Sequence, residues 1–147
     1  MSESTNISLI DTNVFVHAYS SSDAVKHVLA KRFVSPCWQK KVTFALSVQN
    51  LAEFFVVVTK KVKVPLGVEE AEQIITDITA FSHWKILQYN EKTLQRAIQL
   101  HKKARHHFWD AILAATMQEF GISHIFTENI NDFKKFAGII AKNPLVP

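Results

Sequence analysis

Cysteine, glycine and proline are all scarce in this sequence. Its 147 residues include a single cysteine, Cys37, so no disulfide can form within the chain, as is usual in a reducing cytoplasm. With three glycines and four prolines, the chain is not of a low-complexity or collagen-like type. A basic start followed by a long apolar run is also missing, because Asp11 interrupts the one candidate stretch. We therefore expect a cytoplasmic protein without a signal peptide or a membrane span.

Hydrophobic residues and a moderate positive charge are what the sequence does contain. Hydrophobic residues make up 48% of the chain, enough to bury the core of a single domain over residues 1–147. The net charge is +4, and basic residues gather at 60–63 and at 101–107. A solvated helix face explains either cluster about as well as contact with a polyanion does. The adjacent His106 and His107 do not share a helix face, so solvent or phosphate contact is favoured over metal binding.

The stretch 7–16 runs from an apolar strand into a carboxylate and then into a second apolar run. Residues 7–10 are typical of a short buried strand, and Asp11 follows where that strand ends. Ligands of open α/β sheets gather at the carboxyl ends of strands. Thr12 and Asn13 follow as capping-type residues before a short helix at 14–19. Asp11 is therefore either a helix cap or part of a ligand site.

Apolar periodicity predicts that strands and helices alternate along the rest of the chain. Further strands are expected at residues 42–46, 84–87, 122–127 and 139–140. Helices are expected at residues 24–34, 48–61, 68–81, 91–103 and 110–121, with a helical turn at 133–136. Ser35 and Pro36 should end the first of these helices, and Gly121 should end the last. This alternation favours an α/β fold around a parallel sheet.

Acidic residues recur at similar points of this pattern. Asp11 follows the first strand, and Asp110 begins a helix. Glu128 and Asp132 follow the fourth strand, while Glu53 lies within a helix. Carboxylates that converge at one edge of a sheet would raise one another's pKa, and a divalent cation relieves that repulsion. Oxygen ligands without paired Cys or His favour Mg²⁺ or Mn²⁺ over Zn²⁺. Each residue also has a purely structural explanation, as a helix cap or a boundary residue.

Four short segments resemble the signature of PIN domains. They are DTNV at residues 11–14, LAEF at 51–54, WDAILAAT at 109–116 and TENINDF at 127–133. The closing Asn143-Pro144 adds to the likeness, which covers nearly the whole chain and is nearest to the VapC-like ribonuclease toxins of prokaryotic toxin–antitoxin pairs. The resemblance implies a PIN-like three-layer α/β/α fold whose central parallel sheet has four to five strands. It also implies a metal-dependent endoribonuclease, an antitoxin partner and a homodimer.

The resemblance also assigns the site. Carried over position by position, the three most regular carboxylates of the family match Asp11, Glu53 and Asp110. The fourth matches either Asn129 or Asp132, and we favour Asp132. The polar residues expected to support this cluster, directly or through water, are Thr12, Asn13, Thr127, Glu128 and Asn129.

The predicted function is a Mg²⁺- or Mn²⁺-dependent endoribonuclease that acts as the toxin of a type II toxin–antitoxin pair. Asp11, Glu53, Asp110 and Asp132 would be both metal ligands and catalytic residues. Lys102, Lys103 and Arg105 are expected to steer the RNA backbone. Trp109 and Phe15 are candidates to stack on a base, although core packing is favoured for both.

Two rival functions stay open. The first is a PIN-like protein that binds RNA or a partner without cleaving. The second is another Mg²⁺-dependent phosphotransfer enzyme or phosphatase. That enzyme would need a second Asp two residues after Asp11, where this chain has Asn13, so we rank it low.

Overall fold

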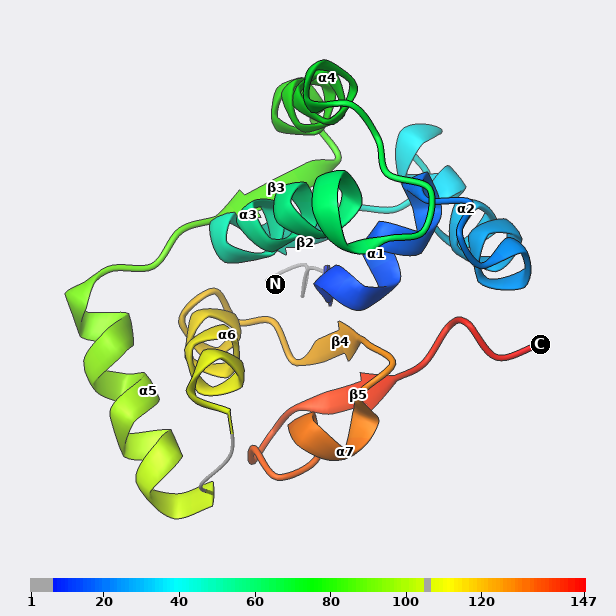
Figure 1. The fold of residues 1–147 in the computed structure, drawn as a ribbon. Coiled ribbons are helices and arrows are strands. Elements are labelled where there is room, and N and C mark those ends of the chain that lie inside the picture. The colour runs from blue at the N-terminus through cyan, green and yellow to red at the C-terminus, as the bar shows by residue number, and fades with distance from the viewer. Residues whose placement is uncertain (1–6, 105–106) are drawn as a thin grey trace.

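Five short strands form one sheet at the centre of the fold. The computed structural model describes residues 7–104 and 107–147, and its strands are β1 (Ser8–Ile10), β2 (Phe44–Ser47), β3 (Trp84–Leu87), β4 (His124–Phe126) and β5 (Ile140–Lys142). Every pairing among these strands is parallel, in the order β3-β2-β1-β4-β5 (Figure 1). The predicted parallel sheet of four to five strands is thereby confirmed.

The first strand in the sequence lies in the middle of the sheet. Leu9 of β1 pairs with Ala45 of β2 on one side and with Ile125 of β4 on the other. From β1 the chain builds outward through β2 to β3, and it then crosses to the other side to add β4 and β5. The carboxyl ends of β1 and β4 therefore border the point where the strand order reverses, which is where open α/β sheets bind ligands.

Helices cover both faces of the sheet. They are α1 (Thr12–Tyr19), α2 (Ala24–Trp38), α3 (Val48–Val56), the π-helical η1 (Val57–Lys61), α4 (Val68–Ala80), α5 (Glu91–Ala104), α6 (Phe108–Glu119) and α7 (Ile130–Phe133). Helices α1 to α4 pack around one core with Ile10 and Leu46, whereas α5 to α7 pack around a second core with Leu9 and Ala45. Successive side chains of a strand point to opposite faces, so each strand contributes to both cores. The three-layer α/β/α fold is as predicted.

Helix α2 continues past the proline that was expected to end it. Pro36 lies in the last turn of α2, which extends to Trp38. In that turn the buried side chains of Val34 and Cys37 pack into the core. The predicted end at residue 34 is therefore wrong, because packing outweighs the loss of one backbone donor near the helix end. Cys37 is a buried free cysteine, and its side chain packs as a small hydrophobic residue.

Helix α6 begins two residues before its predicted start. Its N-cap is His107, so Asp110 lies in the first turn and is not the cap. A carboxylate in the first turn still interacts favourably with the helix dipole. The predicted end is confirmed, since Gly121 has a φ of 69° and follows the last turn. The helical turn expected at 133–136 lies three residues earlier, as α7.

The segment after α3 changes its hydrogen-bond register. The Val57 N–H donates to the carbonyls of both Glu53 and Phe54, and the wider π turns of η1 follow. The Thr59 hydroxyl also donates to the carbonyl of Phe55 at 2.6 Å. The predicted helix thus reaches residue 61, but its last five residues are π-helical. Such turns occur frequently at functional sites.

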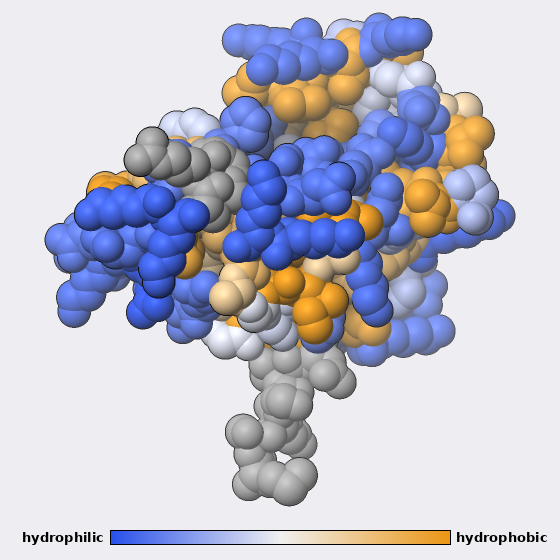
Figure 2. Space-filling model, turned by 90° about the horizontal axis from the view of Figure 1, so that it is seen from below, coloured by the Kyte–Doolittle hydropathy of each residue, from blue (hydrophilic) through white to orange (hydrophobic). Residues whose placement is uncertain are grey.

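The surface is mostly polar on the face drawn in Figure 2, where apolar side chains show between hydrophilic ones. Within the described ranges, no helix combines the length and the apolarity that crossing a bilayer requires.

Candidate active site

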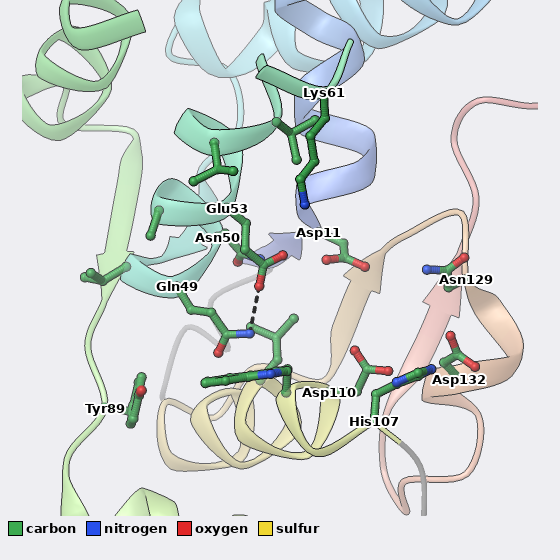
Figure 3. A pocket seen from close by; sticks show the side chains of 16 residues that line it. Asp11, Gln49, Asn50, Glu53, Lys61, Tyr89, His107, Asp110, Asn129 and Asp132 are labelled. Atoms are coloured by element: carbon green, nitrogen blue, oxygen red, sulfur yellow. Dashed lines mark hydrogen bonds between the residues drawn. The ribbon is translucent and has the colours of Figure 1, made fainter. Parts of the chain in front are cut away.

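A cavity of about 850 Å³ opens beside the residues that follow β1 and β4 (Figure 3). Four carboxylates line it: Asp11 after β1, Glu53 on α3, Asp110 on α6 and Asp132 on α7. These are the four residues that the sequence analysis selected, and the fold brings them around one space. Their segments are far apart in the sequence but meet here, because the strand order reverses at this point of the sheet.

Both carboxylate oxygens of Asp11 accept hydrogen bonds. The Thr12 N–H donates to Oδ1 at 2.8 Å, and the Thr127 hydroxyl donates to Oδ2 at 2.8 Å. The amide nitrogen of Asn13 lies 3.4 Å from the same Oδ2. Asp11 is the N-cap of α1, as one of its two sequence interpretations had it, and Thr12 and Asn13 lie in the first turn. It is therefore both a helix cap and a cavity residue.

The environment of the cavity shifts two carboxylates toward their neutral forms. Burial raises the pKa of Asp11 from 3.8 to about 6, and the charges of Asp110 and Glu53 add to the rise. The hydrogen bond from Thr127 opposes this shift. Burial also raises the pKa of Asp110, with the charge of Asp132 as the next cause. In this cavity the charged forms of both carboxylates are therefore less favourable than they would be in water.

Asn13 and Thr127 join the segment after β4 to the segment after β1. Asn13 Oδ1 accepts a hydrogen bond from the N–H of Glu128 at 3.1 Å. Thr127 Oγ1 accepts one from the N–H of Asn129 at 3.0 Å. These two bonds fix the backbone of residues 127–129 next to Asp11.

Thr12 contacts α3 and does not line the cavity. Asn50 donates from Nδ2 to the Thr12 hydroxyl at 3.0 Å, and its Oδ1 accepts from the N–H of Ser47 at 3.1 Å in the capping box that begins α3. Asn50 is 2% exposed, yet it also lines the cavity. This bridge fixes α3, and with it Glu53, relative to the start of α1.

Glu53 and Lys61 approach the cavity from consecutive helical segments. Glu53 Oε1 accepts a hydrogen bond from Gln49 Nε2 at 3.0 Å. Lys61 lines the cavity from the end of η1, and Figure 3 shows its amino group extending toward Asp11. With the residues that the structure describes, Lys61 forms no ion pair. In the sequence, Lys61 belongs to the basic cluster at 60–63, and nothing in that pattern assigns it to the cavity.

Glu128 and Asn129 are neighbours in the sequence but lie in different surroundings. Asn129 lines the cavity together with Asp132. The carboxylate of Glu128 instead contacts Lys26 Nζ at 2.6 Å and His17 Nε2 at 3.4 Å. The fold therefore brings Asn129 to the acidic cavity, while the Glu128 side chain pairs with α1 and α2.

The two aromatic residues considered for base stacking, Phe15 and Trp109, lie in different environments. Phe15 is 1% exposed and belongs to the core, as expected. Trp109 is 60% exposed and lines the cavity, so the prediction of core packing is wrong for this residue. It lies in the first turn of α6, where one side of the helix is open to the cavity. Tyr89 and His107 also line the cavity and were not selected as site residues.

The two described lysines of the predicted RNA-steering run are not part of the cavity lining. Lys102 and Lys103 are exposed in the last turn of α5 and do not line the cavity. Arg105 and His106 lie outside the described residues.

The donor set of the cavity fits a hard divalent cation. Its ligands would all be oxygens, the type that Mg²⁺ and Mn²⁺ prefer, from Asp11, Glu53, Asp110, Asp132 and the amide of Asn129. Burial, with the neighbouring carboxylates as lesser causes, raises the pKa of Asp11 and of Asp110, and a bound cation would favour their charged forms. In the part of the chain that the structure describes, no three acidic, histidine or cysteine side chains are grouped closely enough to hold one ion in this arrangement.

A parallel α/β sheet with an acidic cavity at its topological switch point defines the class of this protein. Comparison with known families narrows that class, because the model of the PIN domain matches residues 8–139. The chain belongs to the PIN domain family. No curated protein sequence matches it.

Solved structures similar to this one come from toxin–antitoxin systems. VapC20 of Mycobacterium tuberculosis, a sarcin–ricin loop cleaving toxin, has a TM-score of 0.66 and 18% identity, over 91% of this chain and 98% of that one. A toxin–antitoxin complex from Klebsiella pneumoniae has a TM-score of 0.64 and 22% identity, over 93% and 97%. VapBC2 from Rickettsia felis, bound to a promoter DNA fragment, has a TM-score of 0.65 and 20% identity, over 93% and 98%. At these identities the likeness is one of fold.

Proposed function

We propose that this chain is a metal-dependent endoribonuclease and the toxin of a type II toxin–antitoxin pair, acting in the cytoplasm. The observation that carries the proposal is the convergence of four carboxylates on one cavity, where burial raises the pKa of Asp11 to about 6. Membership of the PIN domain family and likeness to toxin structures support it.

The residues of the cavity would have different roles in phosphodiester cleavage. Asp11, Glu53, Asp110 and Asp132 would hold one or two Mg²⁺ or Mn²⁺ ions. A cation bound there supplies Lewis-acid polarisation of a phosphodiester oxygen and a hydroxide nucleophile at neutral pH. A coordinating carboxylate must be charged, so protonation of Asp11, whose pKa is about 6, would compete with the cation in mildly acidic solution. Thr127 keeps the carboxylate of Asp11 oriented, through its 2.8 Å hydrogen bond.

A protein partner and a homodimer belong to the same proposal. An Arg or Lys from an antitoxin would be strongly favoured among these uncompensated carboxylates. Val48 and Val56 on α3 line the cavity and are 45% and 41% exposed, so they offer apolar area for an antitoxin or a second copy. The similar structures from Klebsiella pneumoniae and Rickettsia felis are toxin–antitoxin assemblies.

Expression in a bacterial host tests the toxin function. The chain alone should slow growth, and co-expression with its antitoxin, which we expect a small adjacent gene to encode, should restore it. The Asp11→Asn variant should lose toxicity yet still form the complex, because apolar contacts would provide most of the interface. A chain that neither slows growth nor binds the neighbouring product would contradict the toxin assignment.

Binding of RNA or a partner without cleavage is the second candidate function. It is favoured by one observation, that among the described residues no three potential ligands are grouped closely enough to share an ion. Calorimetric titration with Mn²⁺, run beside a nuclease assay, separates the two functions. Retained RNA binding without Mn²⁺ binding or cleavage would support this second candidate.

A further inference from the structure

We infer that Gln49 is a positioning residue of the acidic cavity, and that its side-chain amide holds the carboxylate of Glu53 in place for a divalent cation. This inference rests on the proposed function, because it concerns the cation that is proposed to bind in the same cavity. Gln49 should therefore control the metal affinity of the chain, and it should do so through Glu53.

The carboxylate of Glu53 is held less firmly than that of Asp11. Asp11 is short, and the Thr12 N–H and the Thr127 hydroxyl each donate to one of its oxygens. Glu53 is longer and is exposed on α3. In the described part of the chain, the one donor to its carboxylate is Gln49 Nε2, which lies 3.0 Å from Oε1. The orientation of Glu53 therefore depends on a single hydrogen bond.

Gln49 is well placed to hold Glu53, because it lies one helical turn earlier on the same face of α3. Both residues line the cavity, and Figure 3 shows the hydrogen bond between their side chains. The backbone around Gln49 is itself fixed. Ser47 and Asn50 form the capping box that begins α3, and the buried Asn50 side chain donates to the hydroxyl of Thr12. Gln49 thus connects Glu53 to a rigid part of the fold.

The Gln49 amide faces Glu53 although this leaves its own oxygen without a partner. An ionised carboxylate can only accept hydrogen bonds, so the amide nitrogen must point toward Glu53. The amide oxygen, Oε1, is then buried, and no donor among the described residues contacts it. A buried acceptor without a donor is destabilising. Local arrangements that lower stability in this way are expected where a site serves a ligand.

A hydrated cation would supply the donor that Gln49 Oε1 lacks. Mg²⁺ usually keeps several water molecules when a protein binds it, and each of these waters is a hydrogen-bond donor. The two ends of the Gln49 amide therefore suit a carboxylate ligand and a water molecule of the ion. Residues that orient a metal ligand typically change metal affinity by about 10- to 100-fold when they are replaced.

A second pair of the same kind lies outside the cavity and provides a matched control. On α4, Gln73 Nε2 donates to Asp77 Oδ1 at 2.8 Å, again across one helical turn. Both residues are exposed, and neither lines the cavity. Such pairs stabilise a helix modestly. Replacing Gln73 therefore shows what the loss of a Gln–carboxylate pair does to a helix alone.

Calorimetric titration of the metal-stripped chain with Mn²⁺ tests the inference. Gln49→Met keeps the length of the side chain but removes the amide. We expect it to weaken Mn²⁺ binding roughly tenfold, whereas Gln73→Met should leave Mn²⁺ affinity unchanged. Denaturant unfolding in EDTA should find Gln49→Met folded and at least as stable as Gln73→Met, because it also removes the unpaired acceptor. A loss of helix stability would then not account for the weaker Mn²⁺ binding.

A double-mutant cycle shows whether Gln49 acts through Glu53. A Glu53→Ala background has no carboxylate to hold, so Gln49→Met should change Mn²⁺ affinity much less there than in the wild type. Equal Mn²⁺ affinities for the wild type and Gln49→Met would overturn the inference. The same loss of affinity with and without the Glu53 carboxylate would also overturn it.

RNA cleavage by the wild-type chain separates this inference from the proposed function. Mn²⁺ binding that depends on Gln49, without any cleavage, would support the positioning role and contradict the ribonuclease function. Mn²⁺-dependent cleavage by a chain whose Mn²⁺ affinity is indifferent to Gln49 would contradict the positioning role alone. A wild-type chain that binds no Mn²⁺ would contradict both.

Discussion

The hydroxyl of Thr127 donates a 2.8 Å hydrogen bond to Oδ2 of Asp11, across 116 positions of sequence. Thr127 is fully buried after β4, and Asp11 directly follows β1. Because β1 and β4 are neighbours, this bond spans the switch point of the sheet. It favours the charged form of a carboxylate whose pKa burial has raised.

Replacing Thr127 by Val removes this donor and keeps a β-branched side chain. We expect the pKa of Asp11 to rise further, because the lost hydrogen bond lowers it. Mn²⁺ affinity requires the charged carboxylate, so it should begin to fall at a higher pH than in the wild type. Thr127→Ser keeps the hydroxyl and serves as the control. Calorimetric Mn²⁺ titrations over mildly acidic and neutral pH measure both variants, and identical pH dependence for Val and Ser would refute the expectation.

Removing the charge of Asp11 should stabilise the metal-free protein at neutral pH. The pKa is about 6 in the folded protein against an ordinary 3.8, so the folded state binds more protons between these values. Stability therefore falls as pH rises through this window, and the loss is complete above the folded pKa. Asp11→Asn should raise the free energy of unfolding by about 1–2 kcal/mol at neutral pH, less than the full shift implies because solvent screens the half-buried group.

Denaturant unfolding in EDTA measures this effect. The stabilisation should vanish in acid, below the pKa of the unfolded chain, where Asp11 is neutral in both states. Asp77→Asn, a change at an exposed carboxylate of α4, is a suitable control. If Asp11→Asn were equally destabilised at neutral and at acidic pH, burial of the Asp11 carboxylate would not be what raises its pKa.

The identity of the fourth ligand can be settled by comparing three neighbouring residues. Asp132 and Asn129 line the cavity, whereas the carboxylate of Glu128 contacts Lys26. Asp132→Asn should therefore reduce Mn²⁺ affinity more than Asn129→Ala, and Glu128→Gln should reduce it least. Calorimetry on the three variants gives the order. A larger loss for Asn129→Ala than for Asp132→Asn would transfer the fourth ligand to Asn129.

Lys61 should act on RNA of any sequence, because a phosphate contact carries no sequence information. Lys61→Gln should weaken single-stranded RNA binding. The slope of log affinity against log salt concentration should become shallower by roughly 0.7, the value for one lost phosphate contact. Lys60→Gln is the control, since Lys60 is exposed beside it and does not line the cavity. The double variant of Lys102 and Lys103 tests the predicted steering run in the same assay. Equal slopes for Lys61→Gln and Lys60→Gln would exclude a phosphate contact at Lys61.

The fold follows from the sequence because most elements carry their own apolar period. Leu9 and Ile10 alternate between two cores, as a buried strand requires. The ends of the helices are predicted less well from the sequence, because they depend on tertiary contacts. Pro36 signals a helix end, but the burial of Val34 and Cys37 keeps α2 intact to Trp38.

The acidic residues of the site were accessible from the sequence, whereas the rest of its lining was not. Strand ends and helix starts select Asp11 and Asp110 by position. Trp109 precedes a buried apolar run, and nothing in that pattern shows that the first turn of α6 faces a cavity. Lys61 reaches the cavity from a π-helical segment, and a change of helical register leaves no mark in apolar periodicity. Glu128 accepts a hydrogen bond from Lys26, which is 102 positions away in the sequence, and only the tertiary fold brings these two residues together.

RNA cleavage by metal-stripped protein, with and without added Mn²⁺, tests the central claim most directly. The wild-type chain and Asp110→Asn are compared on the same single-stranded RNA after treatment with EDTA. The carboxylate cavity predicts cleavage by the wild type only when Mn²⁺ is added, and a loss of about a hundredfold or more in Asp110→Asn. Cleavage that persists in EDTA, or that Asp110→Asn retains in full, would contradict a metal-dependent active site in this cavity.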